Sequence, residues 1–175
     1  IAVPLDSGDF LIAYRTRAYG GGDREVYARR FEADGTPDGG EFKVNAYSTS
    51  TQGHADGISL ADGTYVLVWH SGGQDGSDYG LIVRHYEEDG TPISGEIVVN
   101  THTSQDQWKG KVEALNDGGF FVVWESENQD GDGFGIYGQR FSSSAAKVGS
   151  ELQINTTVTG NQTLADLAVL SDGSL

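Results

Sequence analysis

The residues of this chain best suited to chemistry are oxygen-bearing side chains in two glycine-rich loops, fifty-five positions apart. In the second loop they fall at alternate positions, so one short turn of backbone could aim several oxygens at a single centre. Carboxylate, amide and hydroxyl oxygens arranged in this way bind hard cations such as Ca²⁺. We therefore expect a calcium site, with these candidate ligands: Asn128, Asp130, Asp132, Asp75, Ser77 and Asp78.

The same loops have a second interpretation that needs no metal. Asp and Gly are the residues that tight turns select, because Asp bonds to its own backbone and Gly adopts positive φ. An EF-hand loop would also carry Glu at its twelfth position, which counted from Asn128 is Gln139. Calcium binding and plain turn formation therefore stand side by side as interpretations of these loops.

The two loops belong to a repeat that runs through the whole chain. The stretch 117–125 recurs fifty-five residues earlier at 62–70 and again at 7–15, and residues 172–175 begin it once more. A fixed period of this kind is typical of a repeat architecture, in which the fold follows from one unit. The division that we expect is repeat one at 1–56, repeat two at 57–111, repeat three at 112–166 and the start of a fourth at 167–175.

Each repeat contains four strand-like segments separated by turn signals. The second segment, as in Phe120–Trp124, is apolar at successive positions, so both of its faces should be buried. The fourth, as in Glu151–Asn155, alternates like an outer strand with one wet face. Segment Leu167–Leu170 matches the first strand of a further repeat. These features predict an all-β fold of propeller-like blades, three plus the start of a fourth. A β-solenoid or stacked β-sheets are the alternatives.

Composition restricts the partners of the chain. Asp and Glu number 26 against 11 Lys and Arg, which gives a formal charge of -15. Such a surface repels phosphate backbones and anionic lipids, so we expect no nucleic-acid binding. The apolar runs are about five residues long, far short of the ~20 that cross a bilayer, so we expect no membrane insertion. The chain has no Cys, which removes disulfides and a cysteine nucleophile.

The sequence carries no recognisable catalytic constellation. A Gly-x-Ser-x-Gly elbow, a His-Glu-x-x-His pair and a phosphate loop are all missing, so we predict that the chain is not an enzyme. Tyr14, Trp69 and Trp124 share one repeat position at the end of an apolar strand, which favours core packing over sugar stacking. Trp108 has no aromatic counterpart in the other repeats, and we expect it to be partly buried.

Basic residues recur at a second repeat position, and a Glu recurs on the segment that follows. Their spacing suggests cross-strand partners, and the expected pairs are Arg30 with Glu41, His85 with Glu96 and Arg140 with Glu151.

Several stretches of the third repeat carry a resemblance to a known group of proteins. Trp124–Ser126, Gln129–Gly131, Gly135–Phe141 and Ile154–Thr156 resemble a repeat of very large secreted bacterial proteins. Those proteins often carry hemolysin-type (RTX-like) calcium-binding repeats elsewhere and act as surface proteins or adhesins. The nonapeptide calcium motif itself is missing here. The resemblance implies an extracellular or cell-surface location, and it supplies no known catalytic site.

The main expectation is a non-catalytic structural or adhesive module of a secreted or cell-surface bacterial protein, stabilised by calcium. One alternative is a lectin-like propeller that binds carbohydrate or another cell-surface ligand. Another is an assembly module that forms rings or fibres by self-association. Because the sequence begins and ends inside a repeat, we also expect it to be a piece of a longer protein.

Overall fold

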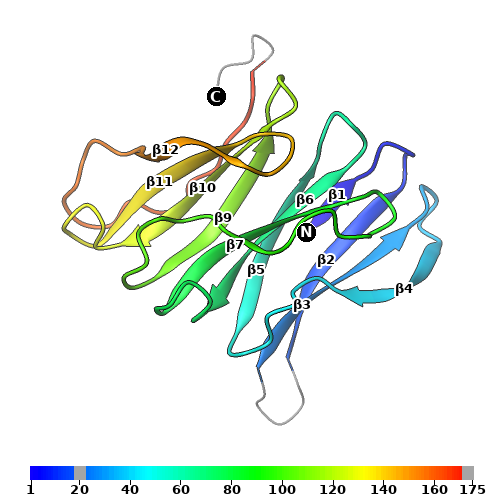
Figure 1. Ribbon diagram of the computed structural model, residues 1–175, viewed down its shortest axis with the longest axis horizontal. Coiled ribbons are helices and arrows are strands. Elements are labelled where there is room, and N and C mark those ends of the chain that lie inside the picture. Colours follow the sequence, from blue (N-terminus) through cyan, green and yellow to red (C-terminus); the bar gives the residue numbers. More distant parts are fainter. Residues whose placement is uncertain (18–22, 171–175) are drawn as a thin grey trace.

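The computed structural model describes residues 1–17 and 23–170 of the chain, and these residues form strands, turns and loops (Figure 1). Within the described residues there are three antiparallel sheets, each with four strands in chain order. None of these residues forms a helix that is long and apolar enough to cross a membrane. The prediction of an all-β fold with four strands in each repeat is confirmed.

We call each four-stranded sheet a blade. Blade 1 consists of β1 (Ala2–Pro4), β2 (Phe10–Arg17), β3 (Arg24–Phe31) and β4 (Pro37–Lys43). Blade 2 consists of β5 (Gln52–Ser59), β6 (Tyr65–Gly72), β7 (Tyr79–Tyr86) and β8 (Ile97–Val98). Blade 3 consists of β9 (Gln107–Ala114), β10 (Phe120–Glu127), β11 (Phe134–Phe141) and β12 (Lys147–Gln153).

The blades are shifted relative to the repeats expected from sequence. The divisions at 56/57 and 111/112 fall inside β5 and β9, because each first strand begins several residues earlier than its apolar part. Residues 154–170 follow β12 outside any strand, so Leu167–Leu170 does not form the expected strand; 171–175 lie outside the described residues. The three sheets also do not close into a ring.

Two layers of apolar side chains join the three blades. The β6 strand supplies both, and all eight of its residues are buried. Tyr65, Leu67 and Trp69 pack into the cluster shared with blade 1. The alternate residues Val66 and Val68 pack into the cluster shared with blade 3. The predicted double burial of the second strand therefore has a simple cause in β6: blade 2 lies between the other two blades. In β2 of blade 1, Phe10, Ile12 and Tyr14 are only partly buried.

A recurring asparagine fastens each outer strand to its neighbour. In blade 2, Asn100 Oδ1 accepts the Leu81 amide at 2.9 Å, and its Nδ2 donates to the His102 carbonyl at 2.8 Å. The same Nδ2 lies 3.1 Å from Gln107 Oε1, at the start of β9. Asn155 repeats this arrangement with Gln162 at 3.0 Å. The Gln residues that recur between blades thus hold the connections in place.

The predicted Arg–Glu and His–Glu pairs are wrong. The basic residues instead contact the turn between the first two strands: Arg30 reaches Asp9 at 2.7 Å, and Arg140 reaches Asp117. His85 Nε2 lies 2.6 Å from Thr64 Oγ1. The repeat shows that these residues recur at one position. It does not show which neighbouring element their side chains face.

The recurring glutamates reach across to the preceding blade. Glu96 Oε1 accepts the Ala46 amide at 2.5 Å, in the connection that follows blade 1. Glu151 Oε2 accepts the Thr101 amide at 2.7 Å, in the connection that follows blade 2. We call this contact the interblade clasp. It adds a charge-assisted hydrogen bond to each apolar interface.

Replacing Trp69 tests the packing between blades. Trp69 has no exposed surface, so Trp69→Ala should lower the free energy of unfolding by about 3–5 kcal/mol. Urea unfolding followed by circular dichroism measures this change. The control is Ile93→Ala, since Ile93 is 46% exposed and should cost less than about 0.5 kcal/mol. Equal effects of the two substitutions would contradict the assigned core.

Candidate functional site

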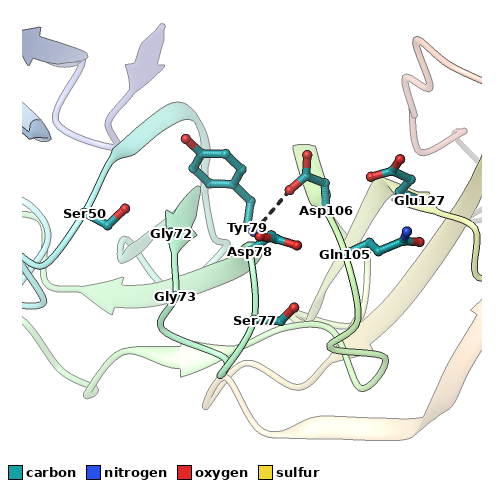
Figure 2. A pocket seen from close by; sticks show the side chains of 9 residues that line it. All are labelled: Ser50, Gly72, Gly73, Ser77, Asp78, Tyr79, Gln105, Asp106 and Glu127. Carbon is teal, nitrogen blue, oxygen red and sulfur yellow. Dashed lines mark hydrogen bonds between the residues drawn. The ribbon is translucent and has the colours of Figure 1, made fainter.

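A polar cleft opens at the seam between blades 2 and 3 (Figure 2). Its volume is about 540 Å³, and it lies where β6 and β10 end and where the connections leading to β5 and β9 pass. Three carboxylates line it: Asp78, Asp106 and Glu127. Tyr79 contributes an aromatic ring and Gln105 an amide. The cleft therefore combines acceptors and a ring from two different blades.

Backbone contacts hold the carboxylates of the cleft in place. Asp106 precedes β9, and its carbonyl accepts the Glu127 amide at 2.8 Å, which ties the connection to the end of β10. The Asp106 carboxylate accepts the Tyr79 amide of blade 2 at 3.3 Å, as the dashed line in Figure 2 shows. Asp106 thus links the two blades where it lines the cleft.

The electrostatics of the cleft are dominated by negative charge. Burial raises the pKa of the Asp106 carboxyl, the Tyr79 amide acts in the opposite direction, and Glu127 and Asp78 raise it further. A raised pKa means that the ionised carboxylate costs free energy in the folded protein. A ligand that donates hydrogen bonds or carries positive charge would relieve this cost, so the cleft favours ligands of those kinds.

Most of the predicted calcium ligands accept hydrogen bonds from nitrogen donors. In blade 2, Asp75 accepts the Ser77 amide at 3.2 Å and Asn100 Nδ2 at 2.8 Å. In blade 3, Asp130 accepts the Asp132 amide at 3.4 Å and Asn155 Nδ2 at 2.9 Å. Blade 1 has Glu25 in this role, against Asn45. The carboxylate thus supports the recurring asparagine.

Two of the remaining calcium-ligand candidates also accept hydrogen bonds from backbone amides. Asn128 Oδ1 accepts the Gly133 amide at 3.1 Å, and Asp132 Oδ2 accepts the Gly160 amide at 3.0 Å. Ser77 and Asp78 line the cleft instead. Across residues 1–17 and 23–170, no three acidic or histidine side chains gather closely enough to hold a metal ion. This arrangement fits turn formation better than a cation shell, and calcium binding stays a prediction.

The tryptophans divide as the sequence suggests. Trp69 and Trp124 are fully buried, which confirms their place in the core. Trp108 is half-buried, as expected: its ring stacks on Phe134 with centroids 5.7 Å apart, and Lys109 Nζ lies 5.2 Å from the ring centre. Trp108, near the start of β9, therefore packs against the first residue of β11.

Two histidines come together although they occupy different repeat positions. The His54 and His70 rings have centroids 4.9 Å apart, and Tyr79 lies 4.8 Å beyond His70. Burial, with smaller effects from His54 and two arginines, lowers the pKa of His70 to about 3. His70 is therefore neutral at physiological pH and supports the Tyr79 ring at the edge of the cleft.

Sequence reasoning missed Asp106, Glu127 and Tyr79 as site residues. The reason is that they do not recur: the counterparts of Asp106 are Thr51 and Asn161, and the counterpart of Glu127 in blade 2 is Gly72. Departures from the repeat were the signal that could have found them. The residues that line the cleft between blades 2 and 3 are therefore ones that depart from the repeat.

Comparisons with known proteins agree on the architecture. No protein-family model and no curated protein matches this sequence. A thermostable family-43 glycoside hydrolase aligns over 89% of this chain and 53% of its own, with a TM-score of 0.57 and 9% identity. A Hadza microbial sialidase aligns over 78% of this chain and 34% of its own, with a TM-score of 0.56 and 15% identity.

A fucose lectin from Kordia zhangzhouensis, solved in complex with methyl-fucoside, aligns over 90% of this chain and 99% of its own. Its TM-score is 0.48 and its identity is 12%. The chain spans about half of the hydrolase and a third of the sialidase. At these identities the similarity to the hydrolase and the sialidase concerns the fold alone, which is that of β-propeller-like blades.

A thermal melt with millimolar calcium, and then with excess chelator, tests the loop carboxylates. Calcium binding, as the sequence predicts it, would raise the midpoint with calcium, whereas loops that serve only as turns would give the same midpoint under both conditions. The nitrogen donors that already engage Asp75 and Asp130 favour the second result. Asp130→Asn should lower the stability by about 1–3 kcal/mol with or without calcium, since Asn155 loses a charged acceptor. A calcium-dependent gain near 2.7 kcal/mol at 100 times the dissociation constant, lost in Asp130→Asn, would instead establish a metal site.

Proposed function

We propose that this chain is a carbohydrate-binding module of β-propeller type, which serves adhesion in a secreted or cell-surface protein. The sugar binds in the cleft between blades 2 and 3. The observation that carries the proposal is the convergence there of Asp78, Asp106 and Glu127 beside the half-buried ring of Tyr79.

The chemistry of the cleft matches the chemistry of a sugar. Carboxylates accept hydroxyl hydrogens in short, charge-assisted hydrogen bonds, and three of them offer acceptors in several directions. An aromatic ring presents a flat apolar face to the C–H groups of a pyranose. The volume of about 540 Å³ falls within the ~300–1,000 Å³ of small-molecule sites. One or two sugar units would fill it.

The charge of the cleft selects among sugars. Three carboxylates on a chain with a formal charge of -15 repel ligands that carry carboxylate or sulfate groups. Neutral sugars and amino sugars meet no such repulsion, and the ammonium group of an amino sugar is attracted by the carboxylates. The proposed ligands are therefore glycans that end in neutral or amino sugars.

The fold and the resemblance give further support. The solved structures that share this fold include a glycoside hydrolase and a sialidase, whose names both refer to carbohydrate substrates. The secreted, adhesive setting rests on the resemblance of the repeat to large bacterial surface proteins and on a sequence without cysteine.

Glycan-array screening of the whole chain, followed by titration calorimetry with the best glycan, tests the proposal. Binding to neutral or amino sugars is expected, with little to sialylated or sulfated glycans. Asp106→Asn should weaken binding by about tenfold or more, because a hydrogen bond to a charged group is worth ~1.5–3 kcal/mol. The same substitution should not destabilise the fold, since the raised pKa of Asp106 shows that its ionised form is unfavourable there.

The matched control is Asp89→Asn, an exposed aspartate in the turn at the opposite end of β7, which should leave binding unchanged. Binding that survives Asp106→Asn and Glu127→Gln, or an array without hits, would contradict the proposal. A second candidate is glycoside hydrolysis, because a raised pKa on Asp106 suits a general acid. Turnover of chromogenic glycosides that disappears in Glu127→Gln would favour it.

A further inference from the structure

We propose that the seam between blades 1 and 2 holds a second binding site, which takes small organic carboxylates with a flat apolar body. The guanidinium group of Arg84 would pair with the carboxylate. This site is separate from the sugar cleft, because Arg84 lies near the end of β7 whereas the cleft residue Tyr79 begins that strand. The inference does not depend on the proposed sugar site.

The site is a cavity of about 400 Å³ between the outer part of blade 1 and the third strand of blade 2. Phe42 and Lys43 line it from β4, Arg84 and Tyr86 line it from β7, and the turn 89–92 adds a further side. Residues of both blades therefore form its walls. The volume falls within the ~300–1,000 Å³ of small-molecule sites.

The guanidinium group of Arg84 is held in a fixed position. Its Nε donates to the Ser94 carbonyl of blade 2 at 3.1 Å, and its Nη1 donates to the Val44 carbonyl of blade 1 at 3.2 Å. Its Cζ lies 5.5 Å from the centre of the Tyr86 ring. Because Arg84 is already ordered by these contacts, a ligand that pairs with it loses little affinity to ordering the side chain.

The charge of Arg84 is not balanced by a carboxylate. Arg30 and Arg140 each form an ion pair with an aspartate in the turn between the first two strands of their blade. Among residues 1–17 and 23–170, no acidic side chain lies within ion-pair distance of Arg84. A half-buried cation without a counter-charge favours an anionic ligand.

The other charged groups of the cavity already have partners. Lys43 Nζ lies 3.0 Å from Glu25 Oε1. Asp89 is exposed, and its Oδ1 accepts the Thr91 amide at 2.8 Å. The unbalanced charge in the cavity is therefore that of Arg84. Its remaining N–H groups, on Nη1 and Nη2, can donate to the two oxygens of a carboxylate.

The apolar surfaces of the cavity define the rest of the ligand. The Phe42 ring is half-buried and lies against the Gly90 backbone, since a Cβ placed on Gly90 would be 3.3 Å from Phe42 Cζ. The Tyr86 ring is fixed by its hydroxyl, which donates to the Val44 carbonyl at 2.9 Å. A flat apolar group packs well against aromatic rings. The ligand class is therefore an aryl or similar carboxylate.

The corresponding place between blades 2 and 3 has different residues. Gln139 occupies the repeat position of Arg84, and Ile97 occupies that of Phe42. The Gln139 amide donates to carbonyls of its own blade. The proposed site thus depends on residues that the repeat does not conserve, and the repeat itself supplies substitutions that this fold accommodates.

A heteronuclear NMR titration of the whole chain with phenylacetate tests the proposal. Saturable shifts are expected for the amides of residues 84–92. Phenylacetamide, which has the same ring without the charge, should bind about tenfold more weakly or less, because a hydrogen bond to a charged group is the stronger kind. This comparison uses the unmodified chain, so it does not depend on the folding of a variant.

Arg84→Gln introduces the residue that blade 3 has at this position, so the fold should be retained, and phenylacetate binding should weaken by about tenfold or more. Phe42→Ile, which copies blade 2, should weaken binding by about threefold. The matched control is Arg29→Gln, the same substitution at the same repeat position of blade 1, which should leave binding unchanged.

Asp106→Asn separates this proposal from the sugar site, because it should weaken glycan binding and leave phenylacetate binding unchanged. The proposal would be overturned by an absence of saturable shifts or by equal affinities for phenylacetate and phenylacetamide. Undiminished phenylacetate binding in a folded Arg84→Gln variant would also overturn it.

Discussion

The double burial of the second strand in blades 2 and 3 is the constraint on which the rest of this structure depends. In β6 and β10 nearly every side chain is buried, so neither face of blade 2 or blade 3 can meet water without exposing a large apolar area. A single blade of this kind cannot be stable by itself. The hydrogen bonds between blades, made by the recurring asparagines and the interblade clasps, align apolar surfaces whose burial already favours packing.

The candidate site is a product of that packing. Asp78 belongs to blade 2 and Glu127 to blade 3, and only the stacking of these blades brings them to one cleft beside Asp106. The raised pKa of the Asp106 carboxyl, caused chiefly by burial and further by Glu127 and Asp78, indicates that the ionised group is unfavourable for folding. The apolar seam below the cleft offsets that cost, and the unfavourable charge is what a hydroxyl-rich or cationic ligand would relieve.

The repeat made the architecture predictable. A period of fifty-five residues with a doubly apolar second segment was enough to predict the four-stranded sheets and the burial of Trp69 and Trp124. The partial burial of Trp108 was also expected, although Trp108 has no aromatic counterpart in the other repeats. The cleft was not predictable in this way, because its residues interrupt the repeat and come from separate loops. The partners of Arg30 and Glu96 could not be predicted either, because a repeat position does not indicate which blade a long side chain faces.

Hydrogen exchange measured along the chain tests most directly whether each blade is completed by its neighbours. The amides of β6 should exchange most slowly, since they lie between two covered faces. The Arg15 amide faces the edge of β2 where the described residues place no strand, so it should exchange much more quickly. Exchange in β6 as fast as at the edge of β2 would contradict the account.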